Sequence, residues 1–589
     1  MPLTHNVRLY YFILFAFAGL LYANTLHHGF VLDDDVVLSQ NSYVQQGIGG
    51  IPAIFSHDSF AGFGKVGEGQ SLLEGGRYRP LSIAFFALIY SFSGLNPFPY
   101  HLFNVLLYGL AGLMVFKWIL LLFKLETNVK WIALATSMLF IAHPLHTEVV
   151  ANCKSADEIL ALLFGIGALF GMVKSVDTKS VWWMILSFVF MLTACLAKEN
   201  AITFLLVAPL TLWFFRKTKI AVLAAQVLPI IAGGLVFLLI RHAVIGSQPT
   251  GLVMHDPLNN PFLEWTGNAW ILCSSATKAA TIIYTFGRSV SLLIFPYPLT
   301  HDYYPFHIQL QSFSGPLVWV SFIVLLLMMG FGLWSILNMR KAGYGLLFFL
   351  ITVSITSNVF FPVGVFMAER FLFLPSLGVL LALVVYGFQL AGPNKQRPVL
   401  FVLGGVTVLF SILTLLRNPA WKDNETLLRT DIVHSPNSAK CQNDLGTNIL
   451  DNALKKTDAT ERSTLLAEAY PHLVRATTLQ PTYYDAYLAS GACAYYLQQY
   501  DRSVDAYRTA LKLYPEDAKS RTGLLFALQA YGRDQWSKHD TLVSLAALTE
   551  AWNMQPDTAV AADLSRYYEF LGQPDKAREW REKVLLFDK

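Results

Sequence analysis

The chain has 589 residues, of which 54% are hydrophobic and 14% are charged, and its formal net charge is +4. Soluble domains contain about 45–50% apolar and about 25% charged residues. The composition therefore excludes disordered, collagen-like and disulfide-knot proteins and argues strongly against a soluble globular enzyme. The small net charge gives no reason to expect nucleic-acid binding. We expect an integral membrane protein.

Long apolar segments fill residues 1–416. A helix needs roughly 17–25 apolar residues to cross a bilayer. The segments that reach this length within a few residues are 9–25, 98–123, 131–150, 157–173, 181–197, 200–215, 220–240, 315–338, 343–362, 371–390 and 398–416. No convincing small-x-small cleavage site follows the first of them, so we interpret it as a membrane anchor and not as a signal peptide.

Two further apolar stretches, 80–95 and 262–295, are interpreted as interfacial or re-entrant helices. The first is only modestly long. The second carries Lys278 and Arg288, and each of these charges costs about 2.5–3.5 kcal/mol at the centre of a lone membrane helix. We therefore do not count either stretch as a span.

Basic residues predict the topology, because Lys and Arg are enriched in cytoplasmic loops. With eleven spans, the basic loops all fall on the side of the N-terminus: Lys124/Lys130, Lys174/Lys179, Arg216–Lys219, Arg340–Lys341 and Lys395/Arg397. This pattern predicts that the N-terminus is inside and the C-terminus outside. The outer face would then hold 26–97, the 142–157 turn, 197–200, 241–314, 362–371 and the whole C-terminal domain.

The first outer segment carries three consecutive carboxylates, Asp33, Asp34 and Asp35. Adjacent carboxylates repel one another, which raises the pKa of at least one of them. They form either a solvated turn or helix cap, or a general-base or metal-associated cluster at the mouth of a membrane cavity. Arg79, directly before the 80–95 stretch, suits a lipid headgroup or a phosphate.

The second outer turn is also polar. His143, His146 and Glu148 have the spacing H-x-x-H-x-E of a metal-binding set, but Pro144 interrupts helical geometry and the HExxH order is absent. We favour a polar rim that supplies hydrogen bonds to a charged ligand. Ionisable residues at such positions are candidates for function, although ion pairs that cap membrane helices are an alternative. Further residues of this kind on the same predicted face are Asp157, Lys198, Glu199, Glu369 and Arg370.

The composition becomes that of a soluble domain at Arg417, and residues 417–589 carry a repeat. Prolines recur at 436, 481, 515 and 556, and the 34 residues from 481 to 515 are the length of a tetratricopeptide repeat (TPR). The consensus aromatic, small and proline positions of that unit are Tyr487, Gly491, Tyr507, Ala510 and Pro515. Such arrays present a concave surface that binds extended peptides or partner proteins.

The five cysteines are scattered and form no CxxC pair. They therefore predict neither a disulfide scaffold nor a zinc or redox site. Cys441 and Cys493 could pair if the C-terminal domain lies outside the cytosol, and the sequence leaves this open.

Together these features resemble the transmembrane and TPR-containing protein O-mannosyltransferases and their bacterial relatives, within the GT-C glycosyltransferases. The resemblance covers nearly the whole chain. The motifs that carry it are Asp33-Asp34 with Asn41, Arg77-Tyr78-Arg79-Pro80-Leu81, His101 with Asn104, His143 to Val150, Lys154 to Leu160, Lys198 to Thr203, Glu369 to Gly378 and Arg417 to Trp421. Two positions depart from the family: Ser155 replaces an Arg, whose charge Lys154 offsets, and Ala201 replaces a Gly. They leave the donor and the acceptor open.

The resemblance implies an all-α fold, with a polytopic GT-C helical bundle of about eleven transmembrane helices in 1–416 and a TPR α-solenoid in 417–589. It implies transfer of a mannose-like sugar from a polyprenyl phosphate to Ser or Thr hydroxyls of exported proteins held by the repeats. The implied roles are a general base at Asp33 or Asp34, cations for the phosphate leaving group at Arg79, Lys198 and Arg370, hydrogen-bond donors at His143 and His146, and supporting acids at Glu148, Asp157 and Glu199.

Other interpretations stay open. The chain could glycosylate a lipid or a surface polysaccharide, or act as a non-catalytic membrane scaffold that recruits partners through its repeats. A transporter is disfavoured, because the polar residues cluster at one surface and not at the midplane. The sequence identifies no certain cofactor and leaves a divalent cation open. Short loops and a compact repeat array favour a bacterial inner membrane, with the active site and repeats on the extracytoplasmic side.

Overall fold

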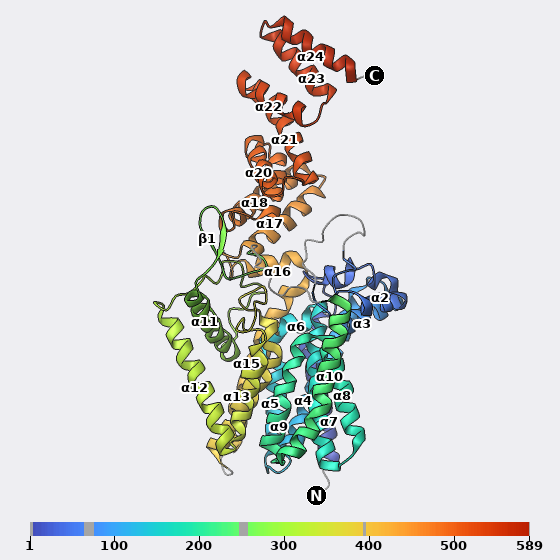
Figure 1. Cartoon of the computed structure of the whole chain (residues 1–589), viewed down its shortest axis with the longest axis vertical. Helices are drawn as coiled ribbons and strands as arrows, with labels where there is room; N and C mark the ends of the chain where they lie inside the picture. The colour runs from blue at the N-terminus through green and yellow to red at the C-terminus, as the bar shows by residue number, and fades with distance from the viewer. Residues whose placement is uncertain (1–3, 64–75, 247–256, 393–395, 588–589) are drawn as a thin grey trace. The chain divides into compact units, whose positions relative to one another are not determined.

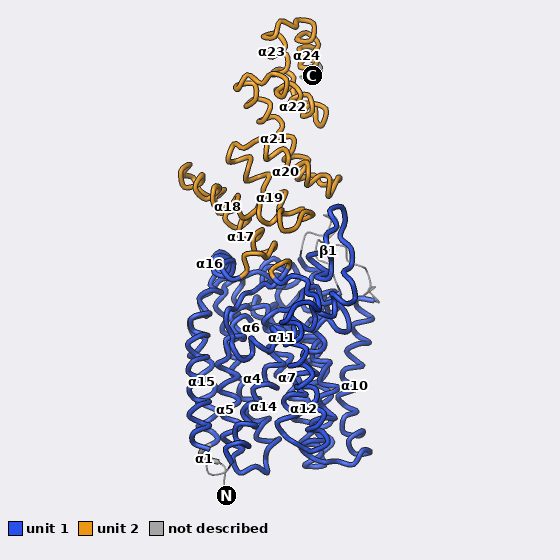
Figure 2. Tube along the Cα trace, turned by 90° about the vertical axis from the view of Figure 1, so that its left-hand side faces the viewer, with its two compact units in different colours: residues 1–304, 308–434 blue, residues 305–307, 435–589 orange. Residues whose placement is uncertain are grey.

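The computed structural model describes residues 4–63, 76–246, 257–392 and 396–587 (Figure 1). Two compact units are present: residues 1–304 with 308–434, and residues 305–307 with 435–589 (Figure 2). The predicted outer segments 26–97 and 241–314 contain 64–75 and 247–256, which lie outside the described residues.

The change in composition at Arg417 falls inside unit 1. The residues that follow form the 3-10 helix η9 (Asn418–Lys422) and α16 (Asn424–Asp431). η9 packs on η1 (Ala23–Thr25) and on the last long helix, and α16 packs on η9. The residues after Arg417, whose composition is that of a soluble domain, therefore belong partly to unit 1 and partly to the repeats.

Unit 1 contains seven helices that are long and apolar enough to cross a membrane, counted over the described residues. They are α1 (Thr4–Tyr22), α4 (Pro97–Leu122), α7 (Ala156–Thr178), α10 (Ile220–Ile245), α12 (Pro316–Asn338), α14 (Phe373–Ala391) and α15 (Gln396–Arg417). Shorter apolar helices accompany them: α3 (Pro80–Ser93), α5 (Val129–Ala142), α8 (Val181–Ala197) and α13 (Lys341–Ser354). The chain is an integral membrane protein, and the number of about eleven spans stays a prediction.

Three predicted spans form shorter helices than expected. In the 131–150 segment α5 ends at Ala142, and only short helices follow, because a residue before proline disfavours helical geometry and His143 precedes Pro144. The 200–215 segment begins with a 3-10 turn, η6 (Glu199–Thr203), before α9 (Phe204–Arg216). The 343–362 segment leaves the helix at Ser354.

The core of unit 1 lies between α4, α5, α7 and α14, whose buried residues form one continuous apolar cluster. Small residues allow close helix contacts, as is common in membrane bundles. A Cβ added at Gly378 of α14 would lie 2.5 Å from the carbonyl oxygen of Gly345 in α13. The two backbones therefore touch at a point where no larger residue fits.

The expectation of one helix across 262–295 is wrong for its first part. Residues 263–272 form an antiparallel hairpin of β1 (Leu263–Trp265) and β2 (Trp270–Leu272). Gly267 has φ of +96°, a turn conformation that glycine adopts readily, and the flanking Trp and Ile residues favour strands. The helical part is α11 (Ser275–Ile294), and the 80–95 stretch is the helix α3, as expected.

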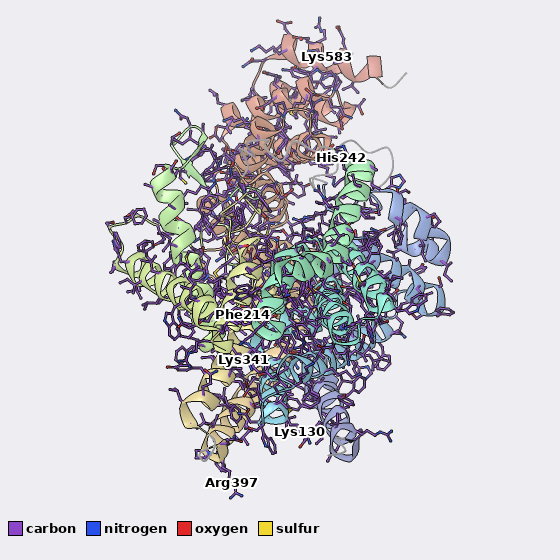
Figure 3. All side chains as sticks on the ribbon, turned by 60° about the horizontal axis from the view of Figure 1, so that its bottom comes forward. Lys130, Phe214, His242, Lys341, Arg397 and Lys583 are labelled. Carbon is purple, nitrogen blue, oxygen red and sulfur yellow. The ribbon has the colours of Figure 1, made fainter. Side chains whose placement is uncertain are left out.

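One end of unit 1 gathers the predicted basic loops. Arg216, the last residue of α9, binds Asp177 at the end of α7 with Nε to Oδ1 at 2.7 Å, and Lys341 Nζ lies 2.5 Å from Glu126 Oε1. Figure 3, in which this end of unit 1 is turned towards the viewer, shows the labelled residues Lys130 and Arg397 low in the picture. The side of the membrane that this end faces stays a prediction.

Short helices join the long ones at the opposite end of unit 1. They are η2 (Asp35–Ser39), η3 (Val44–Gly50), α2 (Ile51–Ser56), η4 (Pro144–His146), α6 (Thr147–Ala151), η5 (Cys153–Ser155) and η7 (Glu369–Leu372). Figure 1 shows α2, α3 and α6 at this end.

Unit 2 is a succession of helix pairs, which confirms the predicted helical repeats. The pairs are α17 (Ala439–Leu454) with α18 (Ala459–Leu479), α19 (Tyr484–Tyr496) with α20 (Tyr500–Leu513), α21 (Ala518–Ser537) with α22 (Thr541–Met554), and α23 (Thr558–Phe570) with α24 (Pro574–Phe587). Each pair follows one of the predicted prolines. Cys441 and Cys493 are both buried free thiols, so the disulfide left open by the sequence is absent from the described residues.

The ring of Tyr507 fills the space between neighbouring helix pairs. A Cβ at Gly491 would lie 3.1 Å from this ring, and a Cβ at Gly523 would come closer still. We expect Gly523→Ala to lower the stability of the repeats by about 1–3 kcal/mol, because the ring has no room to retreat. Thermal unfolding of the full chain would measure this loss. An unchanged or higher melting temperature would contradict this prediction. Gly572→Ala cannot serve as a control: the position has room for a Cβ, but its φ of +70° would strain an alanine.

Candidate functional site

Asp34 anchors the first outer loop inside the protein. Its side chain is fully buried, and its carboxylate accepts hydrogen bonds from the Val31 N–H at 3.0 Å and the Lys154 N–H at 2.6 Å. Asn152 Nδ2 donates to the Val31 carbonyl at 3.0 Å. The loop after α1 is thus bound to the turn between α6 and α7.

Asp33 differs from its neighbour because its side chain is 47% exposed. Its Oδ2 lies 3.6 Å from Lys154 Nζ. The preceding Leu32 has φ of 52°, a conformation that branched residues rarely adopt, and its N–H donates to Asn424 Oδ1 at 2.8 Å. The backbone is therefore held so that one carboxylate points to solvent and the next into the protein.

Burial raises the pKa of Asp34 to about 7, against hydrogen bonds from the Val31 and Lys154 backbone that act to lower it. A carboxyl group whose pKa is higher in the folded state binds more protons there than in the unfolded chain. The contribution of the Asp34 carboxyl group to the free energy of unfolding is therefore fully present below about pH 4, and it is lost as the pH rises towards 7.

This shift predicts a pH dependence of stability. We expect the melting temperature of the wild-type protein, relative to Asp34→Asn, to fall between pH 4.5 and pH 7.5, because the variant has no carboxyl group to ionise. Thermal unfolding of both proteins in detergent across this range would measure the difference. A difference that is constant or grows with pH would contradict the prediction.

Asp157 lies at the centre of a buried group of charges. Its side chain is 2% exposed, and it accepts hydrogen bonds from Arg79 Nη1 at 3.0 Å and Lys198 Nζ at 3.3 Å, while Lys154 Nζ lies 4.0 Å away. Asp157 is in the first turn of α7, where the helix dipole stabilises a negative charge. Three cations surround this one carboxylate, so further acids are needed to balance them.

Glu158 and Glu199 complete that balance. Glu158 is 1% exposed and binds Lys198 Nζ at 2.6 Å, with Asn200 Nδ2 donating at 3.0 Å. Glu199 is 41% exposed and receives Arg79 Nε at 2.7 Å and Nη2 at 2.5 Å, a two-point pair of strong geometry. We call Arg79, Lys154, Asp157, Glu158, Lys198 and Glu199 the Asp157 cluster.

Arg370 forms its ion pair with Glu148, and it lies close enough to Asp33 and to Glu158 of the Asp157 cluster for their charges to attract. Its Nη1 lies 2.5 Å from Glu148 Oε1, and its N–H donates to Glu148 Oε2 at 3.0 Å. The Arg370 side chain is 24% exposed, whereas Glu148 is 3% exposed. Of the predicted cations, Arg370 is the one that reaches the surface with the fewest protein partners.

The two predicted histidines face into the helical core. His143 Nε2 bonds the Leu293 carbonyl at 3.1 Å, and its Nδ1 accepts from the Leu145 N–H at 3.3 Å. His146 Nδ1 lies 2.8 Å from the Tyr108 hydroxyl, and its Nε2 lies 2.9 Å from Ser376 Oγ. Both rings are fully buried, so every ring nitrogen has a protein partner and neither imidazole reaches the Asp157 cluster.

The sequence prediction missed the central roles of Lys154 and Glu158. Lys154 bridges Asp33 and Asp157, and its i,i+3 spacing to Asp157 was a signal that could have identified it. Glu158 had no such signal, because its partners lie forty or more residues away in the sequence. A small cleft beside the cluster is lined by Ser59, Phe60, Arg77, Arg79, Lys154 and Asp157.

The described residues contain no group of three or more His, Cys, Asp or Glu side chains arranged to hold a metal ion. The carboxylates of the Asp157 cluster are instead neutralised by Arg and Lys. The H-x-x-H-x-E spacing does not bring its three side chains together, because both histidines are engaged with the core and Glu148 binds Arg370.

The fold and site define a polytopic membrane protein with a charged cluster and an exposed carboxylate at one end of a helical bundle, followed by helical repeats. No family model matches the chain. It is 25% identical to mouse protein O-mannosyl-transferase TMTC3, over 84% of this chain and 54% of that protein. It is also 25% identical to mouse TMTC4 (73% and 63%) and 26% identical to human TMTC1 (72% and 51%), both with the same descriptive name.

The chain is thus related to the TMTC protein O-mannosyl-transferases, and the resemblance predicted from its motifs is confirmed. It spans between 51% and 63% of the length of these relatives. Among solved structures, the human IFIT1 dimer with PPP-AAAA aligns over 75% of this chain and 94% of its own, with 13% identity. Its TM-score of 0.18 is too low to support a conclusion.

Proposed function

We propose that the chain is a membrane glycosyltransferase that moves a mannose-like sugar from a polyprenyl phosphate to Ser or Thr hydroxyls of exported proteins. The observation that carries this proposal is the exposed carboxylate of Asp33, held next to the Asp157 cluster and electrostatically attracted to Arg370. The names of the relatives support the same reaction class.

Asp33 would act as the general base. A hydroxyl is a poor nucleophile at neutral pH, and a carboxylate within hydrogen-bond reach removes its proton as it attacks. The acceptor oxygen forms a bond to the anomeric carbon of the sugar, and the bond from that carbon to the phosphate oxygen breaks. Asp34 is buried and already binds two backbone N–H groups, so its part is to hold the loop.

Arg370 would bind the phosphate that leaves. The leaving oxygen gains negative charge, which a fixed cation stabilises, and Arg370 is partly exposed. Arg79 and Lys198 bind the carboxylates of the Asp157 cluster, so they hold the site in shape. In this proposal Glu148 would support Arg370, and His143 and His146, whose rings are buried in the helical core, would not contact the donor directly.

The membrane orientation forms part of the proposal. We place the Asp157 cluster and the repeats on the extracytoplasmic side of a bacterial inner membrane, where the repeats would hold the acceptor protein. The basic loops at the other end of unit 1 support this orientation, because Lys and Arg are enriched in cytoplasmic loops. A reporter fused after Lys589 should be active outside the cytoplasm, and cytoplasmic activity would refute this arrangement.

Glycopeptide mass spectrometry of exported proteins would test the reaction itself. Cells that carry the gene should contain hexose-modified Ser or Thr peptides, and cells without it should lack them. Restoration by the wild-type gene but not by Asp33→Asn would support a catalytic role. Restoration by both would favour a non-catalytic scaffold, and modified lipids or polysaccharide with unmodified proteins would assign a different acceptor.

A further inference from the structure

A second group of buried charges lies outside the proposed reaction centre. Asp431, the last residue of α16, is fully buried and accepts hydrogen bonds from Arg417 Nη1 at 2.5 Å and Nη2 at 2.9 Å. The same carboxylate receives the His301 N–H at 2.6 Å and lies 2.9 Å from His301 Nδ1. Asp431 therefore joins the end of α15 to a loop more than a hundred residues earlier.

The neighbouring residues of that loop bind another buried carboxylate. The Thr300 N–H donates to Glu369 Oε1 at 2.6 Å, and the Tyr303 hydroxyl donates to the same oxygen at 2.8 Å. Residues 296–303 form no helix or strand, so these hydrogen bonds determine where the loop lies. Consecutive N–H groups, at 300 and 301, thus point to two different carboxylates.

Glu369 directly precedes Arg370. Glu148 in turn binds both the backbone N–H and the guanidinium of Arg370. Arg370 is therefore held between Glu148 and the contacts of its neighbour Glu369. A shift of the 300–303 loop would move Glu369 and, with it, the backbone that carries Arg370.

We propose that Asp431 is a positioning residue for Arg370 and acts through the 300–303 loop and Glu369. This inference rests on the proposed function, in which Arg370 binds the phosphate of a polyprenyl donor. The chain passes from unit 1 to unit 2 after residue 434 and again after residue 304. Each of these two boundaries lies within four residues of Asp431 or Tyr303. The hydrogen bonds of Asp431 and Glu369 therefore connect the segments next to the repeats with the cation proposed to bind the donor.

Binding of undecaprenyl phosphate to the purified full chain in detergent tests the inference. We expect Asp431→Asn to weaken binding about threefold to tenfold, the size of effect seen for residues that act through others. Glu425→Gln, on the same helix and 39% exposed, should bind like the wild type. Arg370→Gln should weaken binding at least as much as Asp431→Asn does.

The double variant decides whether Asp431 acts through Arg370. If it does, Asp431→Asn should add little to the loss caused by Arg370→Gln, because the effects of coupled residues do not add. Full additivity, or unchanged binding by Asp431→Asn, would overturn the inference. Tyr303→Phe, which removes one hydroxyl from Glu369 and keeps the ring, should weaken binding in the same direction and replaces Asp431→Asn if that variant does not fold. Absence of binding by the wild type would refute the proposed donor instead, and the inference with it.

Discussion

Asp33→Asn is expected to abolish sugar transfer while leaving the abundance and melting temperature of the protein unchanged. The substitution removes the base but keeps the shape of an exposed side chain, and general-base catalysis contributes about 10²–10⁴-fold to rate. Its nearest cation, Lys154, lies 3.6 Å away and keeps its other partner, Asp157. Transfer from a synthetic polyprenyl-phosphate mannose to an acceptor peptide, followed by mass spectrometry, would measure the loss.

Asp34→Asn is the matched control on the adjacent residue. An amide at this position would place an NH₂ group against a backbone N–H of Val31 or Lys154, and a buried polar group without its partner costs about 1–3 kcal/mol. We expect a lower melting temperature, with residual activity in the protein that remains folded. An active Asp33→Asn and a stable but inactive Asp34→Asn would reverse the two assignments.

Lys198→Met is expected to destabilise the membrane unit by about 3–5 kcal/mol, because it leaves the buried carboxylate of Glu158 without its cation. Lys198 is 4% exposed and binds both Asp157 and Glu158, which are 2% and 1% exposed. Thermal unfolding in detergent would measure the change. Lys124→Met, whose side chain is 44% exposed at the opposite end of unit 1, should cost less than about 1 kcal/mol.

A second substitution separates loss of charge balance from loss of packing. Glu158→Gln in the Lys198→Met background removes the carboxylate that lost its cation, while Asp157 keeps Arg79, and should restore part of the lost stability. If the double variant is no more stable than Lys198→Met alone, the Asp157 cluster is not the cause of the loss.

Adjacent charged residues were a poor guide to ion pairs in this chain. Lys198–Glu199 and Glu369–Arg370 were both open to interpretation as local caps of membrane helices. In the structure Lys198 binds Glu158 and Glu199 binds Arg79, 120 residues earlier. Residues next to each other at a helix end point in different directions, so each finds its partner in another segment.

The histidines illustrate the same limit. Their spacing and their place in a motif indicated that His143 and His146 belong to a polar rim. The structure places both rings in the core, where backbone and hydroxyl groups satisfy them. A motif identifies residues that matter, but it does not distinguish a side chain that binds a ligand from one that supports the fold.

The sequence by itself determined the membrane class, the helical repeats and the family resemblance, because these depend on hydrophobic length and on spacing within a few tens of residues. Only the tertiary structure decided which of Asp33 and Asp34 is exposed. That choice depends on Lys154, which lies 120 residues away in the sequence and donates its backbone N–H to Asp34. Contacts between residues so far apart in the sequence leave no local sequence pattern. These contacts are the reason why one of two neighbouring carboxylates is buried and the other is exposed.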